Sequence, residues 1–184
     1  MKKNILIVLI LVVLVFIAGF GYWFYQIKTI NVAIKQNTTD FKNCTYNIDG
    51  QNITLKNGYS EVQTVAGSAS NLITEYFGNE IVADFNGDGV KDDAFLLTQN
   101  SGGSGTFYYV VVGLSSKNGC KGTNAILLGD RIAPQTTELS NGEIIVNYAD
   151  RKLSEPMSAT PSVNISKYFV VKDDSLVEDI KSST

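Results

Sequence analysis

The segment from Ile81 to Thr98 constrains the fold more than any other part of the chain. Short apolar runs, Ile81–Ala83 and Ala94–Thr98, open and close it, and the acidic, glycine-containing stretch Asp84–Asp92 lies between them. Each apolar run is too short for an ordinary helix and has the length and composition of a strand. The sequence therefore predicts two β-strands that are joined by a tight acidic loop.

This loop carries oxygen-bearing side chains at every second position. Asp84, Asn86 and Asp88 alternate with other residues, and Asp92 follows two positions after Val90. A calcium ion collects about 6–8 oxygen ligands, and a short loop can supply them from alternate residues. We therefore predict a structural Ca²⁺ site made of these four side chains and the carbonyl of Val90. The alternative is a tight turn whose acidic side chains are solvated.

The loop is not an EF-hand, because that motif closes with a Glu at its twelfth position, where this chain has Phe95. The spacing DxNxDGxxD between strands resembles the calcium loop of FG-GAP and VCBS-type repeats. That resemblance extends over Ile81–Thr98 and implies a calcium-binding corner between two strands. A β-propeller requires several such repeats, whereas the motif occurs once in this chain.

The first 30 residues form an appendage to the domain. Lys2 and Lys3 precede the uncharged stretch Ile5–Tyr25, which is long enough to cross a bilayer as a helix. Its aromatic end, Tyr22–Tyr25, suits the far membrane interface, and the lysines favour a cytoplasmic N-terminus. The stretch is longer than the apolar region of a cleaved signal peptide. We predict an uncleaved transmembrane anchor over residues 1–30, with the remainder of the chain extracytoplasmic.

Beyond the anchor, we expect a stalk over residues 31–40, one domain over residues 41–180 and a frayed tail over residues 181–184. Short apolar segments separated by Gly and Asn turns predict a mainly β domain, an antiparallel sandwich or a barrel-like fold. One short helix is expected over Gly67–Gly78, where serines can cap its start and Gly78 can end it.

Two further segments have a clear pattern. Asp49-Gly50 is a strong two-residue turn signal and predicts a hairpin over Thr45–Leu55. Phe107–Val112 is apolar at every position, which predicts a central strand buried on both faces. The alternative for the aromatic residues of this strand is the floor of a ligand groove. The segment Lys117–Gly122 is expected to be a turn.

The chain contains 2 cysteines, Cys44 and Cys120, and both follow the predicted anchor. An even number of cysteines in an oxidising compartment predicts a disulfide. Two buried thiols are the alternative. Two cysteines without a single His argue against zinc or iron.

Charge and composition limit the function. Without Lys2 and Lys3 the chain has 13 basic and 18 acidic residues, a net charge of −5, whereas a nucleic-acid surface needs clustered Lys and Arg. The absence of His removes histidine-based triads and dyads. We therefore predict neither nucleic-acid binding nor enzymatic activity. A hydrolase that uses paired carboxylates, such as Asp92-Asp93, is the weakest of our hypotheses.

Together these features predict a membrane-anchored binding or interaction module of the cell envelope. Its partners would be the membrane, through the N-terminal helix, and another envelope protein. The alternative is a structural or assembly subunit of an envelope complex, in which the loop binds no metal. The general pattern of the chain resembles the small single-pass envelope proteins of bacteria, and this resemblance of type implies no particular activity.

Overall fold

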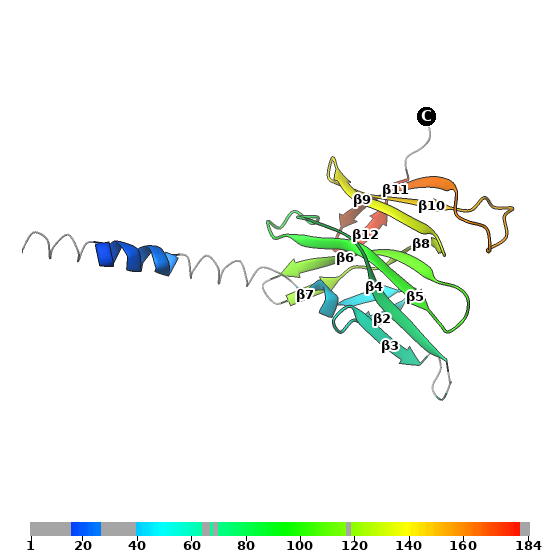
Figure 1. Ribbon diagram of the computed structural model, residues 1–184, viewed down its shortest axis with the longest axis horizontal. Coiled ribbons are helices and arrows are strands. Elements are labelled where there is room, and N and C mark those ends of the chain that lie inside the picture. Colours follow the sequence, from blue (N-terminus) through cyan, green and yellow to red (C-terminus); the bar gives the residue numbers. More distant parts are fainter. Residues whose placement is uncertain (1–15, 27–39, 64–66, 68–69, 117–118, 181–184) are drawn as a thin grey trace, which may run out of the picture. The chain divides into compact units, whose positions relative to one another are not determined.

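The computed structural model describes residues 16–26, 40–63, 67, 70–116 and 119–180 of the chain (Figure 1). The chain divides into two units, Met1–Thr38 and Thr39–Thr184. In the first unit, residues 16–26 are helical. Among the described residues, no helix has both the length and the apolar character needed to cross a membrane. Much of the predicted anchor, nearly all of the predicted stalk and the predicted tail lie outside the described residues.

The second unit is built from strands. Its described residues form one short 3-10 helix and twelve strands. In chain order they are η1 (Phe41–Asn43), β1 (Thr45–Ile48), β2 (Gln51–Thr54), β3 (Tyr59–Gln63), β4 (Asn71–Ala83), β5 (Asp92–Asn100), β6 (Phe107–Ser116), β7 (Gly119–Gly122), β8 (Ile126–Asp130), β9 (Ala133–Ser140), β10 (Glu143–Asp150), β11 (Val163–Lys172) and β12 (Ser175–Glu178).

These strands form three antiparallel sheets. The hairpin β1-β2 is one, and the order β12-β11-β10-β9 gives a second. The largest sheet has the order β3-β4-β5-β6-β7, and β8 also pairs with β6. The predicted mainly β, antiparallel class is therefore confirmed.

The largest sheet has a core on each face. Consecutive residues of a strand point to opposite faces. Ala94 and Leu96 of β5 pack into a core with buried residues of the four-stranded sheet. Phe95 and Leu97 pack into a second core with buried residues of the β1-β2 hairpin. The hairpin and the four-stranded sheet thus cover opposite faces of β5 and β6, and the predicted central position of Phe107–Val112 is confirmed. The predicted burial holds for Tyr109–Val112, whereas Phe107 is exposed and Tyr108 is half-buried.

The predicted hairpin at Asp49-Gly50 is also confirmed. Both turn residues have positive φ, +51° and +83°, as a two-residue turn between twisted strands requires. The strands then pair in register from Thr45 opposite Thr54 to Ile48 opposite Gln51.

The predicted helix over Gly67–Gly78 is wrong, because β4 (Asn71–Ala83) occupies most of that segment. β4 pairs with β3 on one side and with β5 on the other. Apolar residues that are spaced to lie on one side of a helix can also belong to a strand, and β-branched and aromatic residues suit a pleated surface. Gly78 has φ +127° and lies where the register with β5 shifts. It is therefore part of an irregularity within a long strand, and it does not cap a helix.

One strand lies where a turn was expected, and another contains a proline. Gly119–Gly122, in the segment expected to be a turn, forms β7 and pairs with the end of β6. Ala133–Ser140 forms β9 despite Pro134. β9 is an edge strand of its sheet, and an edge strand tolerates a proline because one row of its N–H groups has no partner in the sheet.

Candidate functional site

The acidic loop connects two neighbouring strands at one end of the largest sheet. β4 ends at Ala83, β5 begins at Asp92, and these two residues are paired in register. The flanking segments are therefore strands, as the sequence predicts. The loop between them contains two glycines with positive φ, Gly87 at +79° and Gly89 at +83°, a conformation that side chains with a Cβ rarely adopt.

Asp84 organises the first half of the loop. Its Oδ1 accepts hydrogen bonds from the backbone N–H groups of Gly87 (2.7 Å) and Asp88 (3.2 Å). Its Oδ2 accepts from the N–H of Gly89 (2.9 Å). One exposed carboxylate therefore satisfies three successive backbone donors, and its negative charge faces the loop interior.

Asn86 and Asp88 continue this pattern. The Asp88 N–H donates to Asn86 Oδ1 (3.1 Å), and Asn86 Nδ2 donates to Asp88 Oδ2 (3.3 Å). The Val90 N–H donates to Asp88 Oδ1 (2.7 Å). Asp84, Asn86, Asp88 and Val90 are thus brought together in one continuous network of side-chain and backbone hydrogen bonds.

Asp92 is placed differently, because it is fully buried. Its Oδ2 accepts from the N–H of Phe85 in the loop (3.0 Å), and its Oδ1 accepts from the N–H of Ser115 near the end of β6 (2.8 Å). Burial raises the pKa of Asp92, the two backbone donors lower it, and the charges of Asp88 and Asp84 raise it further. The three carboxylates are therefore close enough to repel one another.

The donor atoms of the loop are hard oxygens, which is the ligand chemistry that calcium prefers. A carboxylate has about four lone-pair sites, so the hydrogen bonds from the backbone do not use all of its capacity. The arrangement is nevertheless incomplete as a coordination shell. Within the described part of the chain, no group of three or more His, Cys, Asp or Glu side chains is arranged to hold a metal ion.

Asp93, the neighbour of Asp92, is a buried acid that our sequence analysis mentions only as part of the Asp92-Asp93 pair. It is 9% exposed, and none of the described residues donates a hydrogen bond to it. Burial, followed by the charges of Glu80 and Asp92, raises its pKa to about 6. Its signal in the sequence is the presence of two consecutive acids at the start of a buried strand, because alternation must turn one acid toward each face.

This alternation also bears on the hydrolase hypothesis. Asp92 and Asp93 are consecutive residues of β5, so their side chains point to opposite faces of the sheet. A glycosidase needs two carboxyl groups on either side of one bond. The geometry of this pair does not match that requirement.

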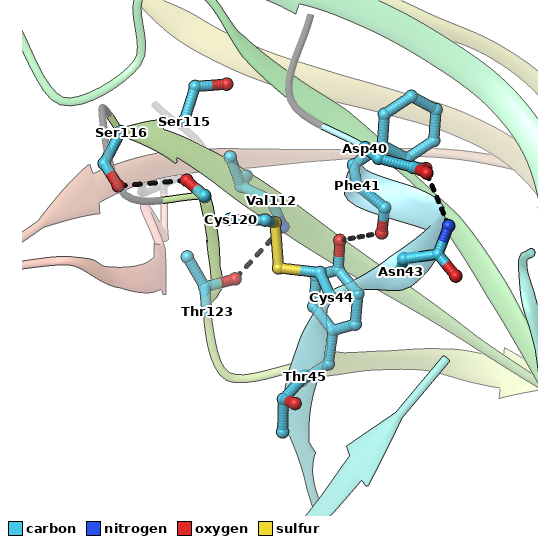
Figure 2. The surroundings of a disulfide bond; sticks show 12 residues. Asp40, Phe41, Asn43, Cys44, Thr45, Val112, Ser115, Ser116, Cys120 and Thr123 are labelled. Atoms are coloured by element: carbon cyan, nitrogen blue, oxygen red, sulfur yellow. Dashed lines mark hydrogen bonds between the residues drawn. A yellow bond between two sulfur atoms is a disulfide. The ribbon is translucent and has the colours of Figure 1, made fainter. Parts of the chain in front are cut away.

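The predicted disulfide between Cys44 and Cys120 is confirmed. It links residues 76 positions apart, with their Cα atoms 5.5 Å from each other. Figure 2 shows the bond beside Phe41, whose carbonyl accepts a hydrogen bond from the Tyr46 hydroxyl (2.8 Å). Cys120 lies opposite Ser115 in the β6–β7 register. The disulfide and the hydrogen bond between Asp92 and Ser115 therefore lie at the same end of β6.

Comparison with known proteins yields no relative. No family model matches this chain, and no curated protein or solved structure shows significant similarity to it. A fold by itself does not establish a function, so a functional argument has to start from the geometry of the acidic loop and of the domain around it.

Proposed function

We propose that this protein is a membrane-anchored binding or interaction module of the cell envelope, in which a Ca²⁺ ion stiffens one end of an extracytoplasmic β-domain. The observation that carries the proposal is Asp92, a buried carboxylate that joins the acidic loop to β6 and lies within the field of Asp84 and Asp88. A cation among these groups would relieve their mutual repulsion.

The ion would have a structural role. Asp84, Asn86, Asp88 and Asp92 supply its side-chain oxygens and Val90 its carbonyl, after a local rearrangement of the loop. Extracellular calcium modules bind with dissociation constants of about 10⁻⁴–10⁻³ M, so the site would be filled at the calcium concentrations outside cells. Because Asp92 also accepts a hydrogen bond from the backbone N–H of Ser115, an ion bound in the loop would stabilise the end of β6 as well.

Two features support an extracytoplasmic location. The disulfide between Cys44 and Cys120 is of the kind that forms and persists in oxidising compartments. The uncharged stretch Ile5–Tyr25, preceded by Lys2 and Lys3, has the pattern of an anchor with a cytoplasmic N-terminus. The envelope partners would then be the membrane and another envelope protein.

A second candidate function is a structural or assembly subunit of an envelope complex with no metal in the loop. The specific observation in its favour is that side chains of the loop already accept hydrogen bonds from the loop's own backbone N–H groups. Asp84 accepts three backbone hydrogen bonds, and Asp88 accepts one from the N–H of Val90. Such a turn can be stable without an ion.

Thermal unfolding of the full-length chain separates the two candidates. We expect millimolar Ca²⁺ to raise the melting temperature, because an ion that binds only the folded state stabilises it by mass action. The double variant Asp84→Ala, Asp88→Ala should lose this rise. Asp88→Asn, which retains an acceptor for the Val90 N–H, should weaken the response while leaving the fold intact.

Asp173→Asn is the matched control, since Asp173 also lies in a short turn, between β11 and β12, but outside the acidic loop. It should keep the full calcium response. A melting curve that Ca²⁺ does not shift would remove the metal role and leave the assembly subunit as the proposal.

A further inference from the structure

A cavity of about 350 Å³ opens on the largest sheet, at the end of β5 opposite to the acidic loop. It exists because the β1-β2 hairpin is short. β1 and β2 have four residues each, whereas β6 has ten. The hairpin therefore covers only part of the sheet face, and its turn residue Asp49 forms one wall of the uncovered part.

The floor of this cavity is largely apolar. Gln99 and Phe107 are directly opposite each other in the β5–β6 register, and Leu127 is opposite Tyr109 in the β6–β8 register. Opposite residues present their side chains on the same face. Phe107 is 39% exposed and Leu127 is 45% exposed, so an aromatic and an aliphatic side chain are both accessible to a ligand.

The polar groups of the cavity include two acceptors, the Asp49 carboxylate and the side-chain oxygen of Gln99, and Asn100 and Ser101 also line it. Asp49 Oδ2 accepts a hydrogen bond from the Tyr109 hydroxyl (2.8 Å), which fixes the carboxylate at the edge of the cavity. Gln99, which is only 8% exposed, donates from Nε2 to Thr74 Oγ1 (3.2 Å). None of the described residues donates a hydrogen bond to the side-chain oxygen of Gln99. Among the described residues that line the cavity, none is a Lys or an Arg.

We propose that this cavity binds a primary ammonium group on an apolar stem, namely the side chain of a lysine on a partner polypeptide. The ammonium would pair with Asp49 and donate to the free oxygen of Gln99, while its methylene stem packs on Phe107 and Leu127. The charges are complementary, since Asp49 carries the only formal charge among the described residues that line the cavity, and the chain is acidic overall. The exposed ring of Phe107 adds a favourable cation–π surface.

This inference rests on the interaction role proposed above, but not on calcium. The cavity and the acidic loop lie at opposite ends of β5, and the two sites share no residue. A lysine side chain suits both parts of this cavity, because its long apolar stem matches the apolar floor and its single charge matches the carboxylate at the edge.

The test titrates Nα-acetyl-lysine methylamide into the full-length chain in mild detergent, with NMR shifts of the Gln99 side-chain amide as the readout. We expect saturable binding in the millimolar range that weakens as salt is added. Asp49→Asn keeps an acceptor for Tyr109 and suits the positive φ of this turn. It should weaken binding about tenfold, since it removes a charge-assisted hydrogen bond.

Asp173→Asn is the matched control, because Asp173 (φ +50°) and Asp49 (φ +51°) occupy turns of the same conformation. It should leave binding unchanged. Phe107→Leu should weaken binding several-fold without removing the apolar floor. The uncharged analogue Nα-acetyl-norleucine methylamide should fail to bind.

Three results would overturn the proposal. Equal binding of the norleucine analogue would mean that the charge is irrelevant, and equal weakening by both Asp→Asn variants would mean that Asp49 is not the partner of the ammonium. Tighter binding of n-butylammonium than of the lysine derivative would assign the cavity to a free amine rather than to a polypeptide. If Ca²⁺ still raises the melting temperature of the Asp49→Asn variant, a negative result for lysine binding concerns this cavity alone and leaves the proposed calcium role in place.

Discussion

At the scale of single residues, Asp93 is a buried acid to which no described residue donates a hydrogen bond. It lies opposite Gly113 in the β5–β6 register, on the face that the hairpin covers. The hydroxyl of Tyr46 is nearby, and burial, followed by the charge of Asp93, raises the pKa of that tyrosine. Glu80 adds a second carboxylate to the same region. A buried acid without a hydrogen-bond donor costs free energy whenever it is ionised.

Asp93 therefore gives the domain a pH dependence with a definite sign. Its pKa rises from 3.8 to about 6 on folding, so its contribution to stability is fully present below about pH 4 and is lost as the pH rises through about 6. We expect Asp93→Asn to raise the free energy of unfolding at neutral pH by about 1–3 kcal/mol. Urea unfolding at a series of pH values would measure this.

Glu80→Gln provides the comparison, since it removes a neighbouring charge and leaves Asp93 in place. It should produce a smaller gain in stability at neutral pH, because the main cause of the raised pKa is burial. If wild type and Asp93→Asn lose stability in parallel between about pH 4 and pH 7, Asp93 does not carry this pH dependence.

At the scale of elements, the contact between the β1-β2 hairpin and β7 decides how the second core closes. Gly122 ends β7, and a Cβ at this position would collide with the carbonyl of Thr45 and with the ring of Tyr46. Tyr46 is fully buried in the core that the hairpin forms with the largest sheet. The close approach of β7 to the hairpin therefore requires a residue without a side chain.

Gly122→Ala should consequently destabilise the domain by about 1–3 kcal/mol, the usual cost of overpacking a core. The measurement is the midpoint of chemical denaturation. Gly103→Ala is the matched control, because a Cβ at Gly103 meets no atom within 4 Å; its midpoint should barely change. Equal stability of the two variants would contradict the packing of the hairpin on β7.

At the scale of the whole domain, the disulfide joins the segment before β1 to β7 and so closes a loop over 76 residues. In the chain-entropy model a cross-link of this span stabilises a protein by roughly 4 kcal/mol, because it restricts the unfolded chain. We expect the reduced protein to unfold at a distinctly lower urea concentration than the oxidised protein.

The double variant Cys44→Ser, Cys120→Ser is the control for this prediction. It should match the reduced protein and should not respond to added reductant. An unfolding midpoint that is the same with and without reductant in the wild type would show that the bond contributes little to stability.

Features that depend on neighbouring residues were predictable from the sequence. Asp49-Gly50 and the acidic loop Asp84–Asp92 contain the residues that accept positive φ or satisfy backbone donors locally, so their conformations follow from a few consecutive residues. The apolar run Phe107–Val112 predicted a central strand, because few environments other than burial on both faces accommodate it. The pairing of Cys44 with Cys120 followed from their number.

Features that depend on distant partners were settled only by the tertiary structure. The segment within β4 has spacing compatible with a helix, and pairing with β3 and β5 made it a strand. Three other features depend on what packs against them. They are the burial of Asp93, the uncovered floor beside Asp49 and the strand character of Gly119–Gly122. Local sequence specifies backbone angles at turns, but the choice between alternative regular structures is made by the free energy of burial against residues far along the chain.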